Sequence, residues 1–452
     1  MITPPLRLSF GRPFRMVMVS VAILLVASPS VLAQGGGGNG EGGVYIDADG
    51  AIAAKPTNPA VLQRLYAKRI VAAESTQAEL TYISLPRLVA AAAEFQRSNP
   101  GAPLPDELLY LHGLTDIQYL FIYPADGQSA GDIVIAGRAE ALAAESGGVA
   151  MPLASQSHRP YVRLTDLIEL FSLTGPGASR GSAFGCSIDL PTDAPARVDR
   201  ALAGEKQPRS AGERQRQSRN LIDAIGRQPV RYFGFDADSP ISRACLEADY
   251  LLKRITIGLD PSPVAALRHT FTQSGTVFNR WWFTAAPQPL ITDGEGLAFQ
   301  IRQPLRLSTS GDPEREAPAT ESAERYAATF TEHFPAIAAA IPQFSHLEKL
   351  ADLALVASLI RRDALDRAAG WDASTLHQLN LTGERVEPAM LAQTLVNYRD
   401  GSYAVGGVVI QFDQATDPSR RQPDTDNQLA ELRDRPAGDD WHSARPIGTR
   451  SR

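Results

Sequence analysis

Five polar side chains in the middle of the chain have the chemistry of a hydrolase or transferase site. Carboxylates serve as general acids or bases, and lysine or arginine cations bind the anionic groups of a substrate. The five residues are Asp189, Asp249, Lys253, Arg254 and Arg280. A polar cleft shared by them is one hypothesis for this chain. Beside them, Trp282 is a candidate binding platform for a sugar ring or a partner chain, because an indole presents a broad flat surface.

The chain has two cysteines, Cys186 and Cys245. A strand predicted over residues 184–190 and a helix predicted from Pro240 each turn their cysteine toward the core. One interpretation is a disulfide, which would close a loop of about 60 residues and contribute roughly 4 kcal/mol on the chain-entropy account. Two buried free thiols are the alternative. A third interpretation is that Cys186 is a nucleophile paired with His269 or His333.

Three further motifs are incomplete. Ser129 lies in a Gly-x-Ser-x-Gly pattern, but a nucleophile elbow needs a helix after the serine and a strand is predicted over 132–135. The Asp-x-Asp-Gly sequence at 47–50 lacks the distal ligands of a calcium loop. His333 lacks the second histidine of a zinc-binding helix. We therefore predict no metal and no cofactor.

The stretch 239–283 positions most of these residues. Ser239 and Pro240 form an N-cap and first-turn pair, which predicts a helix from there to about residue 257. Similar pairs predict helices after Asn58 and Ser84.

A strand predicted over 276–284 follows that helix. Its side chains alternate between the two faces of a sheet, so Trp281 and Trp282 point in opposite directions. Either the sheet is covered on both faces, or one indole is exposed next to Arg280.

The C-terminal part of the sequence is predicted to be largely helical. A helix from residue 320 should break near Pro335. Ser345 and Glu348 have the spacing of a capping box for a long helix to about residue 369. The segment 353–360 of that helix is apolar almost all round, which predicts a central place in the core.

The first 33 residues have the pattern of a secretory signal. Three arginines precede an apolar run over 16–27, and small residues precede a cut after Ala33. The apolar run is shorter than the ~20 residues of a membrane span, so no span is expected after cleavage. Removing three arginines and no acid moves the net charge from -6 to -9. An acidic protein argues against nucleic acid as a partner.

We predict an α+β fold of mixed helices and short antiparallel strands. The predicted segments are a signal peptide over 1–33, a glycine-rich linker over 34–43, an N-terminal lobe over 44–174, a C-terminal lobe over 175–412 and a disordered tail over 413–452. The tail is predicted to be disordered because it is highly charged and has few large apolar side chains.

Several short blocks of sequence resemble a known family. In chain order they read GLTDIQYLFIYP, DIVIAG, FGCSID, ADYLLKRITIGLD, RWWF and FTEHFPAIAAAIPQFSHLEKLADLALVASLI. Over residues 82–362 the chain resembles domain of unknown function 1598, a family of secreted bacterial proteins best known from planctomycetes. The resemblance implies export and a shared fold, and it implies no catalytic residue.

Two classes of function follow. The first is a non-catalytic structural or partner-binding module, secreted or periplasmic, whose partner is an envelope protein or a glycan. This hypothesis rests on the absence of a complete catalytic or metal motif. The alternative is a cell-envelope hydrolase or transferase with a polar cleft around Asp249, Arg254 and Arg280.

Overall fold

The computed structural model describes residues 43–55, 57–76, 80–126, 130–142, 151–174, 183–205, 208–268, 280–286, 288–311, 318–379, 381, 385–398, 404–412, 417–434 and 441–445. All of these residues belong to one compact unit. The predicted signal peptide, nearly all of the glycine-rich linker and the predicted lobe boundary at 175 lie outside the described residues, as do Ser129 and His269. The signal peptide and the division into two lobes therefore stay predictions.

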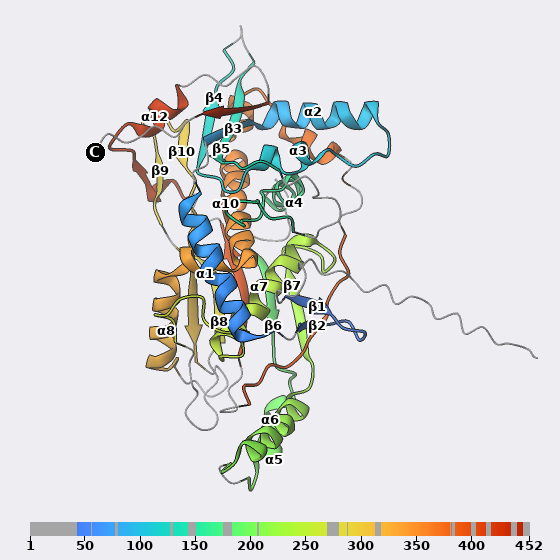
Figure 1. The fold of residues 1–452 in the computed structure, drawn as a ribbon. Helices are drawn as coiled ribbons and strands as arrows, with labels where there is room; N and C mark the ends of the chain where they lie inside the picture. The colour runs from blue at the N-terminus through green and yellow to red at the C-terminus, as the bar shows by residue number, and fades with distance from the viewer. Residues whose placement is uncertain are drawn as a thin grey trace, which may run out of the picture. The chain divides into compact units, whose positions relative to one another are not determined.

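Eight of the described strands form one mixed sheet, which we call the large sheet (Figure 1). Across the sheet the strands are β1 (Val44–Ile46), β2 (Ala51–Ala54), β12 (Leu391–Ala392), β7 (Gln228–Phe233), β6 (Ala183–Ile188), β13 (Val405–Gln411), β8 (Arg280–Ala285) and β11 (Leu305–Ser310). Neighbours are antiparallel except for β12 with β2 and β13 with β8. Strand β13, from near the end of the chain, thus lies between two strands from its middle.

Seven further strands form a second mixed sheet, the small sheet. Its order is β14 (Arg421–Pro423), β9 (Leu290–Thr292), β10 (Ala298–Gln300), β4 (Tyr119–Tyr123), β5 (Asp132–Arg138), β3 (Leu80–Ser84) and β15 (His442–Arg445). Neighbours are antiparallel except for β14 with β9. Each sheet combines strands from distant parts of the sequence.

The described helices connect and cover these sheets. They are α1 (Pro59–Ser75), α2 (Leu85–Ser98), α3 (Asp106–Leu109), α4 (Leu164–Thr174), α5 (Ala194–Leu202), α6 (Ala211–Ile225), α7 (Pro240–Thr256), α8 (Glu321–Glu332), α9 (Phe334–Ala340), α10 (Pro342–Arg362), α11 (Leu365–Ala368) and α12 (Gln428–Arg433). Three short 3-10 helices are η1 (Leu111–Gly113), η2 (Ala373–Gln378) and η3 (Pro418–Arg420). The fold class is α+β, as the sequence predicts. None of the described helices combines the length and apolar composition that a membrane span requires.

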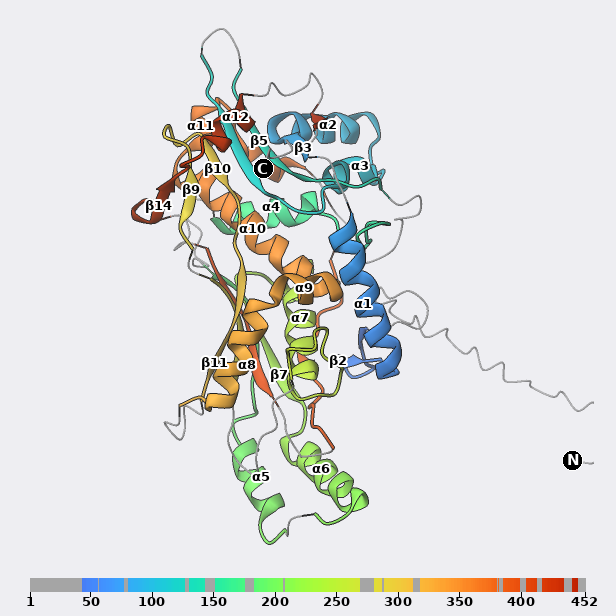
Figure 2. The same cartoon turned by 60° about the vertical axis from the view of Figure 1, so that its left-hand side comes forward.

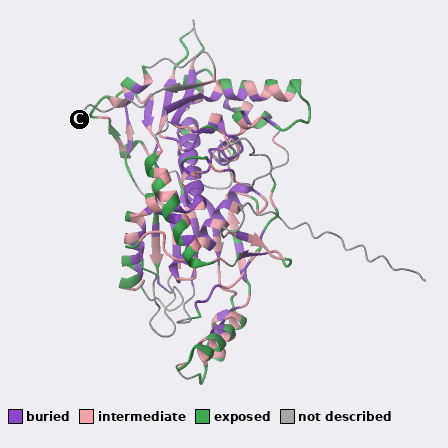
Figure 3. Ribbon diagram, viewed as in Figure 1, coloured by how far each residue is buried: buried purple, intermediate pink, exposed green. Residues whose placement is uncertain are grey.

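Helix α10 is at the centre of the core. Between residues 344 and 360 every side chain except that of Glu348 is buried (Figure 3). The helix packs against α4, α7, α9 and α11 (Figure 2). Its apolar residues belong to one continuous cluster with Ile135 of the small sheet and Val408 of the large sheet. A helix that is apolar all round needs such complete cover.

Local capping explains where several helices begin. The side chains of Asn58, Ser84 and Ser239 each accept a hydrogen bond from a backbone N–H in the first turn of α1, α2 and α7. The predicted capping box at Ser345 is wrong. Helix α10 begins three residues earlier at Pro342, so Ser345 lies inside the helix and bonds to Lys349 instead.

The predicted disulfide is also wrong. Cys186 and Cys245 both face the core, as predicted, but both are free and fully buried thiols. Burial raises the pKa of each thiol, and the nearby carboxylate of Asp249 raises it further. Neither thiol is ionised at pH 7, which also removes the support for a Cys186 nucleophile.

Part of the predicted disordered tail is ordered. Residues 417–434 and 441–445 contain η3, β14, α12 and β15. Leu429 and Leu432 of α12 are buried against a cluster on the small sheet that includes Tyr82 and Phe121. The sheet supplies the apolar surface that the tail lacks, and Arg433 of α12 adds ion pairs with Asp293 and Glu295.

Candidate functional site

The Asp249–Lys253 pair lies inside the protein. Cys245, Asp249 and Lys253 recur every four residues on α7, on the face that packs against β6 and β13. Lys253 Nζ lies 2.7 Å from Asp249 Oδ2 and 3.4 Å from the carbonyl oxygen of Gly406. The two side chains are 2% and 0% exposed, so solvent and substrate do not reach them.

Burial makes this ion pair costly. It raises the pKa of Asp249, although the charge of Lys253 opposes the shift. Asp249 Oδ1 has no hydrogen-bond partner among the described residues. A buried pair with one unsatisfied oxygen is a structural constraint and offers no catalytic access.

The other predicted cleft residues lie elsewhere. Arg254 forms a bidentate pair with Asp260, with both N–O distances at 2.7 Å. Asp189 accepts a hydrogen bond from Ser187 Oγ at 2.6 Å, and Arg231 Nε lies 4.0 Å from it. The structure therefore joins Asp249 to Lys253, and it pairs Arg254 and Asp189 with other partners.

Strand β8 separates the two tryptophans as predicted. Trp281 is buried and contacts Tyr326 of α8, with ring centroids 5.2 Å apart. Trp282 is on the opposite face and half-buried. In the sheet it is paired with Ser308 on one side and Gly407 on the other. A Cβ atom at Gly407 would lie 3.0 Å from the indole, so the glycine leaves room for the ring.

The residues around Trp282 form a polar, cationic surface, which we call the Trp282 face. It consists of Arg280, Trp282, Thr284, Arg306, Ser308 and Gly407. Arg306 is exposed and donates from Nε to Thr284 Oγ1 at 3.3 Å, and that hydroxyl lies 3.2 Å from Ser308 Oγ. Arg280 begins the strand two residues before Trp282 and is half-buried. None of these six residues is a carboxylate; on the same face of the sheet, Ser187 of β6 is paired with Gly407, and Asp189 accepts a hydrogen bond from the Ser187 hydroxyl.

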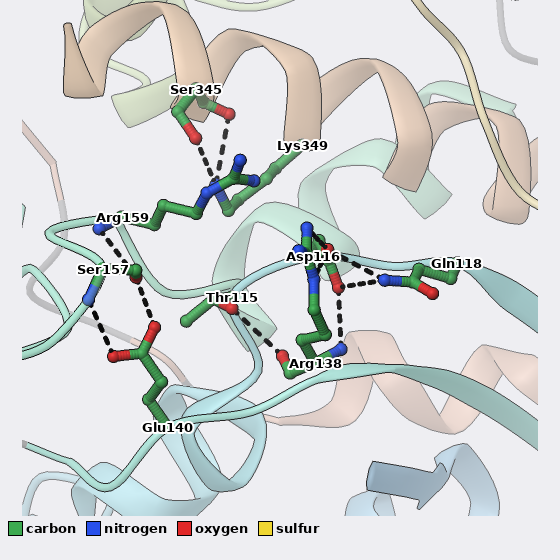
Figure 4. Close-up of polar contacts among 9 residues, drawn as sticks. All are labelled: Thr115, Asp116, Gln118, Arg138, Glu140, Ser157, Arg159, Ser345 and Lys349. Carbon is green, nitrogen blue, oxygen red and sulfur yellow. Dashed lines mark hydrogen bonds and ion pairs between the residues drawn. The ribbon is translucent and has the colours of Figure 1, made fainter. Parts of the chain in front are cut away.

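A second polar group, the Lys349 cluster, was not predicted from the sequence (Figure 4). It lies where the C-terminal end of β5, the segment that follows η1, and helix α10 meet. Its members are Asp116, Arg138, Glu140, Ser157, Arg159, Ser345, Glu348, Lys349 and Asp352. Asp116 accepts from Arg138 Nε at 2.6 Å and from the Arg138 backbone N–H at 2.7 Å. Lys349 Nζ donates to Ser345 Oγ at 2.7 Å.

The Lys349 cluster shifts the pKa values of its members. Burial lowers the pKa of Lys349 to about 7, and the charge of Arg159 acts in the same direction. Burial raises the pKa of Glu348 and of Asp352. Burial alone would raise the pKa of Asp116, but the adjacent Arg138 outweighs it and lowers the value. The Lys349 amine therefore loses its proton at a much lower pH than an exposed lysine does.

The cluster joins segments that are distant in the sequence. Its guanidinium groups come from the last residue of β5 and from the segment between β5 and α4, and its amine comes from α10 (Figure 4). The serine and lysine at 345 and 349 share one helix face. That four-residue spacing is the sequence signal of the cluster, whereas the capping-box pattern of Ser345 and Glu348 predicts a helix start at the same serine.

Metal binding has no support in the described ranges. Within them, no three side chains of histidine, cysteine, aspartate or glutamate come together in a way that could hold an ion. His333 ends α8, and its partner in the cysteine hypothesis, Cys186, is buried.

One comparison with known proteins gives a match. The family model described as a protein of unknown function (DUF1598) matches residues 186–269. The matched segment contains both cysteines and the Asp249–Lys253 pair, but neither the Trp282 face nor the Lys349 cluster. The wider resemblance and the export that it implies stay predictions. Searches of curated proteins and of solved structures gave no match.

The Asp249–Lys253 pair gives a prediction for stability. Replacing Lys253→Met leaves a buried carboxyl without its partner, so the free energy of unfolding should fall by about 3–5 kcal/mol. The double variant Asp249→Leu with Lys253→Met should recover part of this loss. Urea denaturation of the singles and the double measures the coupling. A double variant that costs the sum of the two singles would contradict a coupled pair.

The shifted pKa of Lys349 gives a prediction for pH dependence. The unfolded lysine keeps its proton up to about pH 10.4, whereas the folded one loses it near pH 7, so stability rises with pH between these values. From pH 7 to pH 9 the wild type should gain about 2 kcal/mol relative to Lys349→Met. Urea denaturation at several pH values tests this, with the exposed Lys68→Met as control. Parallel curves for the wild type and Lys349→Met would refute the shift.

Proposed function

We propose that the protein is a non-catalytic binding module of the extracytoplasmic space and that its Trp282 face binds an anionic glycan. The observation that carries the proposal is a half-buried indole placed between Gly407 and Ser308, with Arg280 and Arg306 beside it. The predicted signal peptide supports the location. The DUF1598 match supports neither a catalytic role nor a non-catalytic one.

The shape of the Trp282 face suits a sugar ring. The apolar C–H face of a sugar stacks on an indole, and its hydroxyl groups need donors and acceptors around that ring. Thr284 and Ser308 provide such hydroxyls on the same face. On the β13 side the indole packs against Gly407, where a Cβ atom would come within 3.0 Å of the ring.

The charge of the face selects the kind of glycan. Arg280 and Arg306 are cations that can bind a carboxylate of a uronic acid or a similar sugar. The protein as a whole is acidic, with a net charge of -6, so this attraction is local. Binding should therefore weaken as salt screens the two arginines.

The composition of the face favours binding over turnover. Glycoside hydrolysis in most families uses a pair of carboxylates on either side of the bond. The six residues of the Trp282 face supply no such pair, since Asp189, on the same face of the sheet beyond Ser187, is a single carboxylate that already accepts a hydrogen bond from that serine. This favours the non-catalytic class over the polar-cleft hypothesis.

Titration with polygalacturonate tests the proposal, with neutral dextran as the comparison polymer. Trp282→Ala should weaken binding about tenfold or more, since loss of one stacked ring removes on the order of 1.4 kcal/mol. Arg280→Gln should weaken it and reduce its salt dependence, whereas Arg97→Gln on α2 should change nothing. Isothermal titration calorimetry gives the affinities. Equal binding by Trp282→Ala and the wild type would sink the proposal.

A second candidate function rests on the contact between Ser345 and Lys349. A neutral lysine amine beside a serine hydroxyl is the arrangement of serine–lysine hydrolases, in which the amine takes the serine proton. The contact is 2.7 Å and the pKa of Lys349 is about 7. Both side chains are buried, at 1% and 3% exposure, and burial limits the access of a substrate. This observation favours the glycan-binding proposal over the hydrolase.

A fluorophosphonate probe distinguishes the two candidates. A serine nucleophile activated by Lys349 should be labelled at Ser345, and labelling should disappear in both Ser345→Ala and Lys349→Met. Intact-mass analysis detects the adduct. A wild-type chain that stays unlabelled would exclude the hydrolase and leave the glycan-binding proposal untouched.

A further inference from the structure

Strand β15 occupies the edge of the small sheet. Its backbone pairs antiparallel with β3, from His442 opposite Ile83 to Arg445 opposite Leu80. The ladder continues one residue further, because the Ser84 N–H donates to the carbonyl of Trp441 at 2.9 Å. Strand β15 is the last element of the sheet, so β3 would be the edge without it.

The strand beneath β15 is well ordered. All five residues of β3 are buried, and on its other side it pairs along its whole length with β5. Ile83 belongs to the main core, and Tyr82 stacks on Phe121 with ring centroids 5.9 Å apart. An ordered strand with a free edge is a template for pairing with another extended chain.

The segment that covers this edge is short and polar. It reads His-Ser-Ala-Arg and comes from the charged C-terminal tail. Sequences of this kind have low strand propensity. Its contacts include backbone pairing with β3 and the rings of Trp441 and His442.

These two rings contact a preformed turn. Leu111, His112 and Gly113 are three consecutive residues with positive φ, at 48°, 54° and 81°. A Cβ atom at Gly113 would lie 2.0 Å from the carbonyl oxygen of Glu140, so the close approach requires glycine. Non-glycine residues keep this conformation only where the surrounding structure fixes the backbone.

The turn presents the ring of His112 to the tail. That ring stacks on His442 with centroids 3.7 Å apart and meets Trp441 edge-on at 5.8 Å. Burial lowers the pKa of His112, and the neighbouring His442 lowers it further, while Glu107 of α3 opposes the shift. The ring is therefore neutral at pH 7 and free to stack.

We propose that the β3 edge, together with the His112 turn, is a docking site for an extended strand of a partner protein with an aromatic residue in the position of Trp441, and that β15 is an intramolecular occupant that the partner displaces. This is strand addition to a sheet edge, in which backbone bonds supply affinity and one side-chain anchor supplies register. The site is independent of the Trp282 face, which belongs to the large sheet.

The charge and composition of β15 fit this role. A segment tethered to its own site has a high effective concentration, so even weak pairing keeps the edge closed. A partner strand with more apolar residues would form the same backbone bonds and bury more surface. The tail thus protects the edge from unspecific pairing while leaving it available.

The test uses the full chain and a fluorescein-labelled peptide of sequence Trp-His-Ser-Ala-Arg. In the full-length variant Ser443→Pro, the proline removes a backbone donor and loosens β15 without altering β3 or the turn. This variant should bind the peptide at least tenfold more tightly than the wild type does, as measured by fluorescence anisotropy. The same peptide with alanine for tryptophan should not bind.

Further variants make the result specific. In the Ser443→Pro background, His112→Ala should abolish peptide binding, and Trp282→Ala should leave it unchanged. Hydrogen exchange at the amides of Tyr82 and Ser84, which face β15, should rise in Ser443→Pro and fall again when the peptide is added, whereas the amides of Thr81 and Ile83, which face β5, should stay protected.

Two outcomes would overturn the proposal. One is equal, weak peptide binding by the wild type and Ser443→Pro while exchange confirms that the β3 amides have opened. The other is a stable dimer of the unmodified chain that the peptide dissociates, because the occupant would then be a second copy.

Discussion

The burial of α10 is the constraint on which the rest of the structure depends. The 353–360 part of this helix is apolar almost all round, and such a segment cannot be stable until every side is covered. The cover comes from α4, α7, α9 and α11, and from residues of both sheets in the same cluster. The two sheets are therefore parts of one core.

Charged groups in this core limit what can be changed near α10. The Asp249–Lys253 pair lies on α7, which packs against α10, and the Lys349 cluster includes residues of α10 itself. Each buried charge depends on a partner to offset its desolvation. These groups fix how the elements fit together, while the two surfaces that we propose for binding, the Trp282 face and the β3 edge, lie on the sheets.

Features set by neighbouring residues could be predicted from the sequence. The caps at Asn58, Ser84 and Ser239 and the opposite orientations of Trp281 and Trp282 follow from local spacing. Distances between segments that are far apart in the sequence cannot be predicted from local spacing. Inward-facing cysteines predict burial, but not that two thiols will meet.

The Lys349 cluster and the ordered tail show the same limit. Asp116 and Arg138 come together because β5 ends beside the residues that follow η1, and no periodicity in the sequence signals that meeting. The tail has too few apolar residues to fold alone, so composition predicts disorder. Composition does not reveal that the outer side of the small sheet offers a surface for Leu429 and Leu432.

The position of β13 has a consequence for the order of folding. Residues 405–411 form the strand between β6 and β8, so the large sheet cannot close until nearly the whole chain is available. Contacts between such distant segments slow folding and leave unpaired strands exposed in the meantime. If the chain is exported, as its N-terminal sequence predicts, its middle strands stay unpaired until β13 has been synthesised. A chaperone that binds extended apolar segments would therefore be needed most between the synthesis of β6 and that of β13.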